Sequence, residues 1–312
     1  MKKALLVFAA LCLLLLSACG AKTYSFIRIS GGEAAPAEAK NGFSEPLPCL
    51  VYTADGDVFY SENYKHSQPL VGLIEDPSCG TVMDAAKLAD KWLEGGERVM
   101  MIYIDGLGLD AYLRALDAGL VPNLAALEQS FCAAVYPTIT PVNYAAMVTG
   151  EPPKTTGVTG RGIHQIACET IFVRAAAAGL RSFVSEGDTQ ILALPEAEME
   201  LSPDLNGNGT GDDEILDCAL EHTDVSLLFV HFHGVDDASH AFGPGSPEAD
   251  AAIADADARC GELLSAWDGR VVILADHGQH VQDGTGDPAY ADRRGTHGDF
   301  APSDIFVPFL TR

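Results

Sequence analysis

Apolar runs alternate with helical patterns through most of the chain after residue 97. Four short runs are apolar on both faces, and each stops at a polar residue or glycine; they are Arg98–Asp105, Leu180–Gly187, Val225–Gly234 and Arg270–Gly278. Strands of this kind are typical of a parallel sheet that is covered by helices on both sides. We therefore expect an α/β fold with a mostly parallel central sheet. The predicted helical stretches in this part are Val121–Ser130, Thr170–Ala178, Asp213–Glu221 and Pro247–Trp267.

The part before residue 98 has a different pattern. Leu50–Tyr64 has two β-rich runs around a polar turn, which predicts a hairpin. Thr81–Glu94 has apolar residues at helical spacing and ends at a Gly-Gly pair, which predicts a helix. Residues 19–48 have mixed composition, and we interpret them as a tether. The predicted catalytic domain is 49–312, with the hairpin and helix of 49–97 appended to it.

The first twenty residues resemble a bacterial lipoprotein signal. Lys2 and Lys3 precede the apolar run Ala4–Leu16, which is too short for a comfortable membrane span. Small residues then lead to Cys19, as in a lipobox, where the cysteine becomes the lipidated first residue. A plain signal peptide with an incidental cysteine is the alternative. We predict a signal peptide at 1–18, lipidation of Cys19, and an extracytoplasmic, membrane-anchored bacterial lipoprotein.

The net charge of the chain limits the classes of partner that it is expected to bind. Removing residues 1–18, which carry Lys2, Lys3 and no acidic residue, would take the formal net charge from −25 to −27. Such a surface repels polyphosphates at long range, so we expect no nucleic-acid binding by charge attraction. A phosphate-handling site in this chain needs its own local positive charge, which points to metal ions.

The cysteines leave the disulfide pattern open. Six follow Cys19, and six cysteines allow 15 full pairings among which the sequence does not choose. They are Cys49, Cys79, Cys132, Cys168, Cys218 and Cys260.

Acidic and imidazole side chains follow the apolar runs where ligands bind in parallel sheets, at the carboxyl ends of the strands. Taken singly, each has an ordinary explanation as a turn residue or a hydrogen-bonded loop histidine. Taken together, three aspartates and three histidines suffice for two open catalytic metal sites. Oxygen and imidazole ligands without thiolates suit zinc or manganese. The six residues are Asp105, Asp236, His240, Asp276, His277 and His297.

The segment Pro137–Gly150, PTITPVNYAAMVTG, has two interpretations. Thr140 followed by Pro141 is a common sequence at the start of a helix, with the threonine as N-cap and Gly150 beyond the helix end. The same threonine is also a candidate nucleophile.

These motifs, in this order, resemble the alkaline phosphatase superfamily and, within it, the nucleotide pyrophosphatase/phosphodiesterase branch. The resemblance covers most of Arg98–Phe309. It rests on the strand that ends in Asp-Gly, P-T-x-T…N…V-T-G, D-x-x-x-H followed by G-P, A-D-H-G, and G-[ST]-H-G. It implies a three-layer sandwich of the alkaline phosphatase type.

The resemblance also implies a role for each matching residue. One metal goes to Asp236, His240 and His297, with Asp237 as a competing choice at a less suitable spacing. The other goes to Asp105, Asp276 and His277, with the Thr140 oxygen as a further ligand. Thr140 is the implied nucleophile, in preference to Thr138, and Asn143 the implied hydrogen-bond donor to a phosphate oxygen.

The implied activity is hydrolysis of phosphodiester or pyrophosphate bonds in a small phosphate ester, through a phosphothreonine intermediate. Two divalent metal ions would take part, with zinc preferred and manganese as the alternative. A phosphomonoesterase or phosphonate hydrolase of the same superfamily would share all six ligands. A non-catalytic surface-binding lipoprotein is the alternative from another class, and the oligomeric state is not predicted.

Two further features have weaker signals. Asp204–Asp212 resembles a calcium loop at its first ligand positions, but Ile215 stands where such loops carry glutamate, so a polar surface turn is favoured. Arg161 and His164 follow the Thr140 segment and are candidate substrate contacts. The remaining histidines have no implied role and are expected on the surface or in packing: His66, His222, His231, His233 and His280.

Overall fold

The computed structural model describes residues 23–40, 44–45, 48–62, 64–65, 69–75, 79–282 and 293–312. Cys19 and His66 lie outside the described residues, as does the predicted signal peptide. The chain forms two compact units, one of Met1–Ala54 with Phe59–Asp76 and the other of Asp55–Val58 with Pro77–Arg312.

The first unit is built on an antiparallel-rich sheet. In its described part, five strands lie in the order β2-β1-β7-β4-β5. Phe26, Val51 and Leu73 are among the buried residues that pack together in its core. The strands are β1 (Thr23–Ser30), β2 (Glu33–Lys40), β4 (Cys49–Thr53), β5 (Val58–Ser61) and β7 (Leu70–Ile74), and a short pair is formed by β3 (Ser44–Glu45) and β6 (Tyr64–Lys65).

The prediction of a tether is wrong for residues 23–40. They form the hairpin β1–β2, in which Ser30 pairs with Glu33 across Gly31 and Gly32. Both glycines have positive φ, 59° and 82°, which is what a two-residue hairpin turn of the favoured hand requires. The alanine- and glutamate-rich composition of β2 gives it a low intrinsic β propensity, so pairing with its neighbour decides its conformation.

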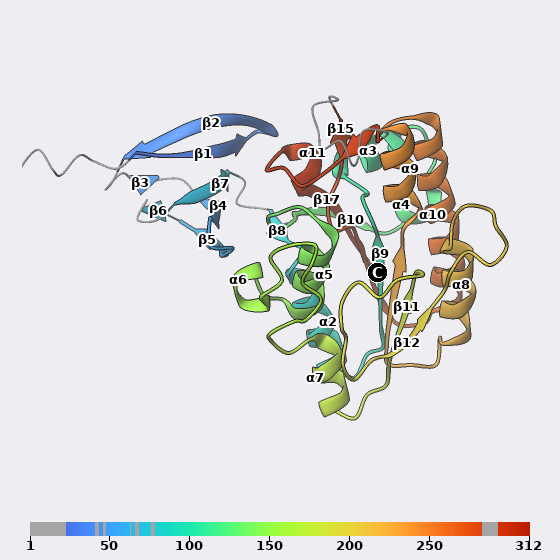
Figure 1. Cartoon of the computed structure of the whole chain (residues 1–312). Coiled ribbons are helices and arrows are strands. Elements are labelled where there is room, and N and C mark those ends of the chain that lie inside the picture. The colour runs from blue at the N-terminus through green and yellow to red at the C-terminus, as the bar shows by residue number, and fades with distance from the viewer. Residues whose placement is uncertain are drawn as a thin grey trace, which may run out of the picture. The chain divides into compact units, whose positions relative to one another are not determined.

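The second unit contains a sheet of eight strands in the described residues, in the order β12-β11-β13-β9-β14-β17-β10-β8 (Figure 1). The four predicted strands β11, β13, β9 and β14 lie side by side and parallel at its centre. β17 is antiparallel to both of its neighbours. The strands are β8 (Gly80–Thr81), β9 (Val99–Ile104), β10 (Glu128–Ala133), β11 (Ser182–Glu186), β12 (Glu198–Leu201), β13 (Leu227–Phe232), β14 (Arg270–Leu274) and β17 (Phe306–Thr311).

Helices cover both faces of this sheet, which confirms the predicted α/β fold (Figure 1). Helices α2 (Asp84–Glu94), α5 (Thr140–Thr149), α6 (Pro153–Thr156) and α7 (Ile171–Ala177) pack together in one layer. The other layer is built around α10 (Pro247–Ala266), which packs against α3 (Leu109–Asp117), α4 (Pro122–Ala125), α8 (Asp212–Glu221) and α9 (Gly234–Phe242). A short helix, α11 (Pro302–Ile305), precedes β17, and β15 (His280–Val281) pairs with β16 (Gly295–Thr296). None of the described helices combines the length and apolar character that a membrane crossing requires.

The predicted helix Val121–Ser130 is largely wrong. Only α4 is helical, and Glu128–Ala133 instead forms β10, which pairs along its length with β17. The side-chain amide of Gln129 donates hydrogen bonds to the carbonyls of Leu124 and Leu127, at 2.8 and 2.9 Å. Glutamate and glutamine are good helix formers, but intrinsic helix propensities are small, so tertiary pairing overrides them here.

Among the described residues, Cys132, Cys168, Cys218 and Cys260 carry free thiols.

Candidate metal centre

The carboxyl ends of three central strands bring the predicted ligands together. In the sheet register, Ile104 of β9 pairs with Phe232 of β13, and Tyr103 pairs with Leu274 of β14. Asp105 directly follows β9, while Asp236 lies in the first turn of α9 after β13. Asp276 follows β14. Three buried hydrophobic strands therefore deliver one carboxylate each to the same edge of the sheet.

The first cluster consists of Asp105, Asp276, His277 and Thr140. His277 Nε2 lies 2.9 Å from Asp276 Oδ2 and 3.6 Å from Asp105 Oδ1. Thr140 Oγ1 lies 3.4 Å from the same nitrogen. All four residues are buried. Two carboxylates, one imidazole and one hydroxyl thus converge on one small volume.

The second cluster consists of Asp236, His240 and His297. Asp236 Oδ2 lies 3.2 Å from His240 Nε2, and Asp236 Oδ1 lies 3.9 Å from His297 Nε2. The rings of His297 and His277 stack at 3.7 Å between centroids, so the two clusters adjoin. Asp237, the competing choice for this cluster, lines a neighbouring cavity instead.

The three imidazoles are oriented by backbone carbonyls. His240 Nδ1 lies 2.8 Å from the carbonyl oxygen of Gly295, and His297 Nδ1 lies 2.8 Å from that of Thr138. His277 Nδ1 lies 3.1 Å from the carbonyl of Gly278. A carbonyl oxygen only accepts, so each Nδ1 carries the hydrogen and each Nε2 faces the cluster. This arrangement is typical of metal-binding histidines.

Thr140 does not cap its helix. Helix α5 begins at Thr140 itself, Ile139 is the N-cap, and no side chain makes a capping hydrogen bond. The N-cap interpretation of Thr140 is therefore wrong, because the hydroxyl points at His277 rather than at the helix amides. Pro141 occupies the second helical position, and Gly150 ends the helix with φ of 78°, as predicted.

Asn143 does not face the clusters as its implied role requires. Its side chain is fully buried, and its Oδ1 accepts a hydrogen bond from the backbone N–H of Val135 at 2.7 Å. Its Nδ2 donates to the backbone carbonyls of Val135, Pro137 and Ile139, at 3.2 to 3.4 Å. The amide group holds the turn that leads to Thr140, and the prediction of a phosphate contact is corrected accordingly.

The buried carboxylates perturb one another. Burial, followed by the charges of Asp276 and Asp236, raises the pKa of Asp105 well above its usual range. Burial would also raise the pKa of Asp236, but the hydrogen bond from His240 and the charges of His277 and His297 outweigh it and lower that pKa. Burial lowers the pKa of His277, but Asp276 and Asp105 outweigh it and raise that pKa to about 9. The centre therefore has an excess of buried negative charge.

This excess fits divalent cations. Asp105 Oδ1 is buried and accepts no hydrogen bond from any described residue. Burying a carboxylate oxygen without a partner is costly unless a cation or a donor satisfies it. Burial and the charge of His277 lower the pKa of His297 to about 3, which keeps that ring neutral and able to donate a lone pair. The donor set and its electrostatics both fit metal ions.

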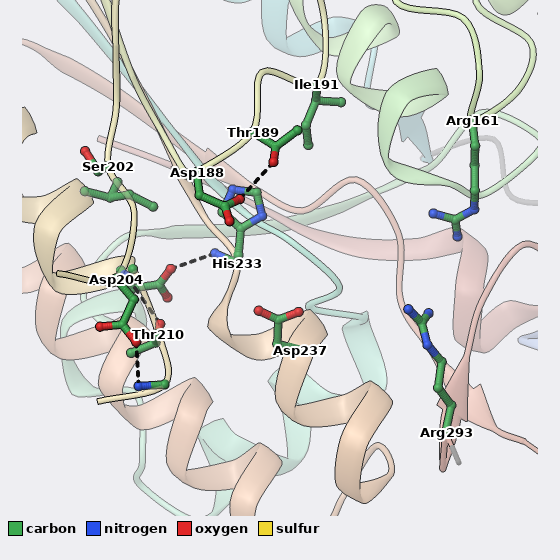
Figure 2. A pocket seen from close by; sticks show the side chains of 15 residues that line it. Arg161, Asp188, Thr189, Ile191, Ser202, Asp204, Thr210, His233, Asp237 and Arg293 are labelled. Carbon is green, nitrogen blue, oxygen red and sulfur yellow. Dashed lines mark hydrogen bonds between the residues drawn. The ribbon is translucent and has the colours of Figure 1, made fainter. Parts of the chain in front are cut away.

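Two arginines lie against the second cluster. Arg161 Nη2 is 3.1 Å from His297 Nε2, and Arg293 Nη1 is 3.1 Å from His240 Nε2. Both line a cavity of about 770 Å³, which His233 and Asp237 also line (Figure 2). Arg293 was not predicted from the sequence, although it lies only four residues before His297.

The other weakly predicted residues lie elsewhere. His164 Nδ1 hydrogen-bonds to the carbonyl of Ile191 at 2.8 Å, and His164 is exposed. In the candidate calcium loop, Asp204 accepts hydrogen bonds from the backbone N–H groups of Gly207, Asn208 and Gly209. These contacts are those of the favoured surface turn, and calcium binding stays a prediction.

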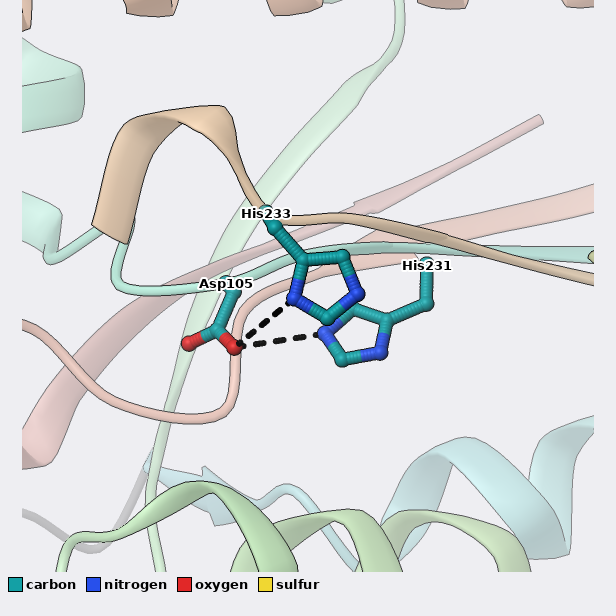
Figure 3. Close-up of side chains that lie close together, drawn as sticks. All are labelled: Asp105, His231 and His233. Carbon is teal, nitrogen blue, oxygen red and sulfur yellow. Dashed lines mark hydrogen bonds and ion pairs between the residues drawn. The ribbon is translucent and has the colours of Figure 1, made fainter. Parts of the chain in front are cut away.

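Two histidines without an implied role, His231 and His233, prove to lie beside Asp105 (Figure 3). His231 is a fully buried packing histidine, as expected, since its ring stacks on Tyr103. The expectation is incomplete for both histidines, because each ring also faces the buried carboxylate of Asp105. Their sequence signal is the alternation His231-Phe232-His233, which places both imidazoles on the same side of an extended segment.

Comparison with known proteins identifies the family of the chain. A model of the family described as type I phosphodiesterase / nucleotide pyrophosphatase matches residues 99–286, more than half of the chain. No curated protein matches the chain in sequence.

Solved structures of ectonucleotide pyrophosphatase/phosphodiesterase 5 show the same fold. Human ectonucleotide pyrophosphatase/phosphodiesterase 5 superposes with a TM-score of 0.55 at 14% identity, covering 69% of this chain and 88% of that protein. An inactive threonine-to-alanine variant of the murine protein, in complex with AMP, gives a TM-score of 0.53 at 14% identity over the same shares. Phosphonoacetate hydrolase from Sinorhizobium meliloti 1021 gives 0.49 at 21% identity; the match spans 61% of this chain and 60% of that protein.

Proposed function

The chain belongs to the type I phosphodiesterase / nucleotide pyrophosphatase family of phosphoric ester hydrolases, and from this premise we propose that it hydrolyses phosphodiester or pyrophosphate bonds through a covalent intermediate on Thr140. The observation that carries the proposal is the position of the Thr140 hydroxyl. It makes no capping bond to its own helix, and it lies 3.4 Å from His277 Nε2 beside two buried carboxylates.

Two groups of residues would hold the metal ions. Asp105, Asp276 and His277, with the Thr140 oxygen, would hold one ion, and Asp236, His240 and His297 would hold the other. When bound, divalent ions would lower the pKa of a coordinated hydroxyl and stabilise negative charge on the phosphoryl group. Zinc suits these ligands best, with manganese as the alternative.

In the proposed reaction, the Thr140 oxygen attacks phosphorus as the hydroxyl gives up its proton. The bond from phosphorus to the leaving oxygen breaks, and that oxygen takes up a proton. Water then attacks the phosphothreonine, so that phosphorus gains an OH group and Thr140 recovers its hydroxyl. The net change is the cleavage of one P–O bond by one water molecule.

The chain supplies several parts of this reaction itself. Helix α5 begins at Thr140, so the positive end of its dipole lies beside the Thr140 hydroxyl and favours an anion there. Pro141 has no N–H group, and those of Val142 and Asn143 bond to the carbonyl of Ile139. Asn143 holds the turn that presents Thr140. Arg161 and Arg293 would bind the phosphate group or its neighbour through charge-assisted hydrogen bonds.

The two arginines also favour a second candidate, phosphomonoesterase or phosphonate hydrolase activity. A monoester or phosphonate carries two negative charges near neutral pH, whereas a diester carries one. Two guanidinium groups against the same cluster complement the more highly charged group better.

We also propose that the protein is anchored outside the cytoplasm by a lipid on Cys19, as the lipobox-like sequence indicates. An anchored, strongly acidic protein would meet small phosphate esters rather than nucleic acid.

Kinetics of Thr140→Ala beside Thr138→Ala test the proposal. Thr138 contributes its backbone carbonyl to His297, so the alanine variant keeps that contact and loses only the hydrogen bond from its hydroxyl to the carbonyl of Asp299. It therefore serves as the control. We expect Thr140→Ala to reduce turnover of bis(p-nitrophenyl) phosphate to background and Thr138→Ala to retain it, with both proteins folded. Equal turnover in the two variants would reject Thr140 as nucleophile. Comparison with p-nitrophenyl phosphate separates the two candidate activities, because a strong preference for the monoester would favour the second.

A further inference from the structure

A third group of side chains that could hold a metal ion shares Asp105 with the first cluster, and its two histidines take no part in the proposed reaction. It consists of Asp105 Oδ2, His231 Nε2 and His233 Nδ1, which lie close enough together to share one ion. We propose that these three residues form a third site for a divalent transition metal, in which Asp105 bridges to the first cluster.

The spacing of the three atoms fits coordination better than hydrogen bonding. His231 Nε2 and His233 Nδ1 lie 3.3 and 3.8 Å from Asp105 Oδ2, and both face this one oxygen (Figure 3). A charge-assisted hydrogen bond would be about 2.7–2.9 Å long. Metal–ligand bonds of about 2.0–2.1 Å in a tetrahedral site place neighbouring donor atoms ~3.3 Å apart. The two clusters assigned to the reaction have donor separations in the same range.

Glu186 gives this group the outer partner that metal-binding histidines need. Its Oε1 lies 2.7 Å from His231 Nδ1 and 2.8 Å from His233 Nε2, the two nitrogens that point away from Asp105. Glu186 is 1% exposed and His231 is fully buried. A carboxylate at this position fixes the ring orientation and keeps the hydrogen on the outer nitrogen, which leaves the inner nitrogen for the metal.

The fold fixes the position of these side chains and leaves the group accessible to an ion from the cavity. His231 stacks on Tyr103 at 3.8 Å between ring centroids and 4° between planes, across the β13–β9 pair. His233 follows β13 and lines the 770 Å³ cavity, with 26% of its side chain exposed. An ion can therefore reach the group from the cavity through His233.

Asp105 can serve both sites because its two oxygens face different partners. Oδ1 faces His277 at 3.6 Å, while Oδ2 faces His231 and His233. Two imidazoles and one carboxylate suit Zn²⁺ and its transition-metal neighbours, and disfavour Mg²⁺ and Ca²⁺, which prefer oxygen ligands.

Metal counting on the purified full chain tests this site. After equilibration with Zn²⁺ and removal of loosely bound ions, we expect about three ions per wild-type chain and about two in His233→Ala. The control is His222→Ala, a partly buried histidine that also stacks on an aromatic ring, Phe183, and it should keep about three. Glu186→Gln should lower the affinity of the third site for Zn²⁺ by ~10- to 100-fold, while the number of ions bound per chain at saturating Zn²⁺ stays at three. A wild-type count of two, or three ions in His233→Ala, would overturn the proposal.

A second measurement keeps the proposal falsifiable if His233→Ala does not fold. Crystals of the zinc-loaded wild-type protein should show an anomalous scattering peak between Asp105 Oδ2, His231 and His233. Absence of that peak, with peaks at the other clusters, would mean that the group is a hydrogen-bonded network and would overturn the proposal. Since the map locates every ion, failure here is distinct from failure of the two-metal centre under "Proposed function".

Discussion

Replacing Gly106 by alanine tests how closely the Asp105 and Asp236 segments must approach. Gly106 has φ of +73°, and a Cβ atom there would lie 2.9 Å from both the Cα and the Oδ1 of Asp236. The left-handed conformation costs an ordinary residue about 1–2 kcal/mol. Contacts under 3.0 Å also force one of the two segments to move. We therefore expect lower stability together with a displaced Asp236 carboxylate.

Gly119→Ala is the matched control. Its φ is +69°, and an added Cβ would meet no described atom within 4 Å. It should lose about 1–2 kcal/mol in urea unfolding and keep its metal content and kcat/KM. Gly106→Ala should lose at least as much stability and, in addition, one bound metal ion per chain and ~10- to 100-fold in kcat/KM, since small misplacements of catalytic groups are costly. If the two variants behave alike in metal content and kcat/KM, the close approach does not matter and the reasoning is refuted.

Three further predictions concern the two arginines, the proton on His277 and the lipid anchor. Alanine at either arginine, in Arg161→Ala or Arg293→Ala, should lower kcat/KM ~10- to 100-fold. The variant Arg161→Lys should retain only part of the wild-type kcat/KM, because lysine cannot form a bidentate contact. Unchanged steady-state kinetics in these variants would contradict the assignment. The pKa of His277 is raised to about 9 in the metal-free protein, so zinc binding must displace the proton of this ring. The affinity of the protein for zinc should therefore rise up to ~10-fold per pH unit between pH 6 and 8. Calorimetry in buffers of different ionisation enthalpy should detect the released proton, and pH-independent binding would refute the assignment. Cys19→Ala should abolish fatty-acid labelling and move the protein from the membrane to the soluble fraction, whereas labelling that persists would place the lipid elsewhere.

The residues at the strand ends were predictable because a local signal coincides with a general rule. A run such as Arg98–Asp105 is apolar on both faces, which indicates a buried parallel strand, and ligands gather at the carboxyl ends of such strands. The structure places Asp105, Asp236 and Asp276 at that edge of the sheet. The α/β fold with its mostly parallel central sheet follows from the same pattern, whereas the order of the strands in the sheet does not.

What could not be predicted depends on partners far apart in the chain. His231 and His233 become notable only because Glu186 and Asp105 converge on them from β11 and β9. The implied phosphate contact of Asn143 fails for a local reason. Its side-chain oxygen and nitrogen both form hydrogen bonds with backbone groups that lie a few residues earlier in the chain.

Two errors of interpretation concern backbone conformation. The composition of residues 23–40 predicts a tether, whereas the Gly31-Gly32 pair is itself the signal of the hairpin that the structure shows. The Thr-Pro pair predicts Thr140 as an N-cap, besides its candidacy as nucleophile. The structure places the cap one residue earlier, at Ile139, and this shift leaves the Thr140 hydroxyl without a capping bond.

Trapping the covalent intermediate tests the central claim most directly. Zinc-loaded protein is mixed with a phosphodiester substrate, quenched in acid during turnover, digested, and examined by mass spectrometry. The proposed mechanism predicts a phosphoryl adduct on Thr140 in the peptide that contains PTITPVNYAAMVTG, absent from metal-free protein and from Thr140→Ala. An adduct on another residue, or full turnover by Thr140→Ala, would contradict the claim that Thr140 is the nucleophile.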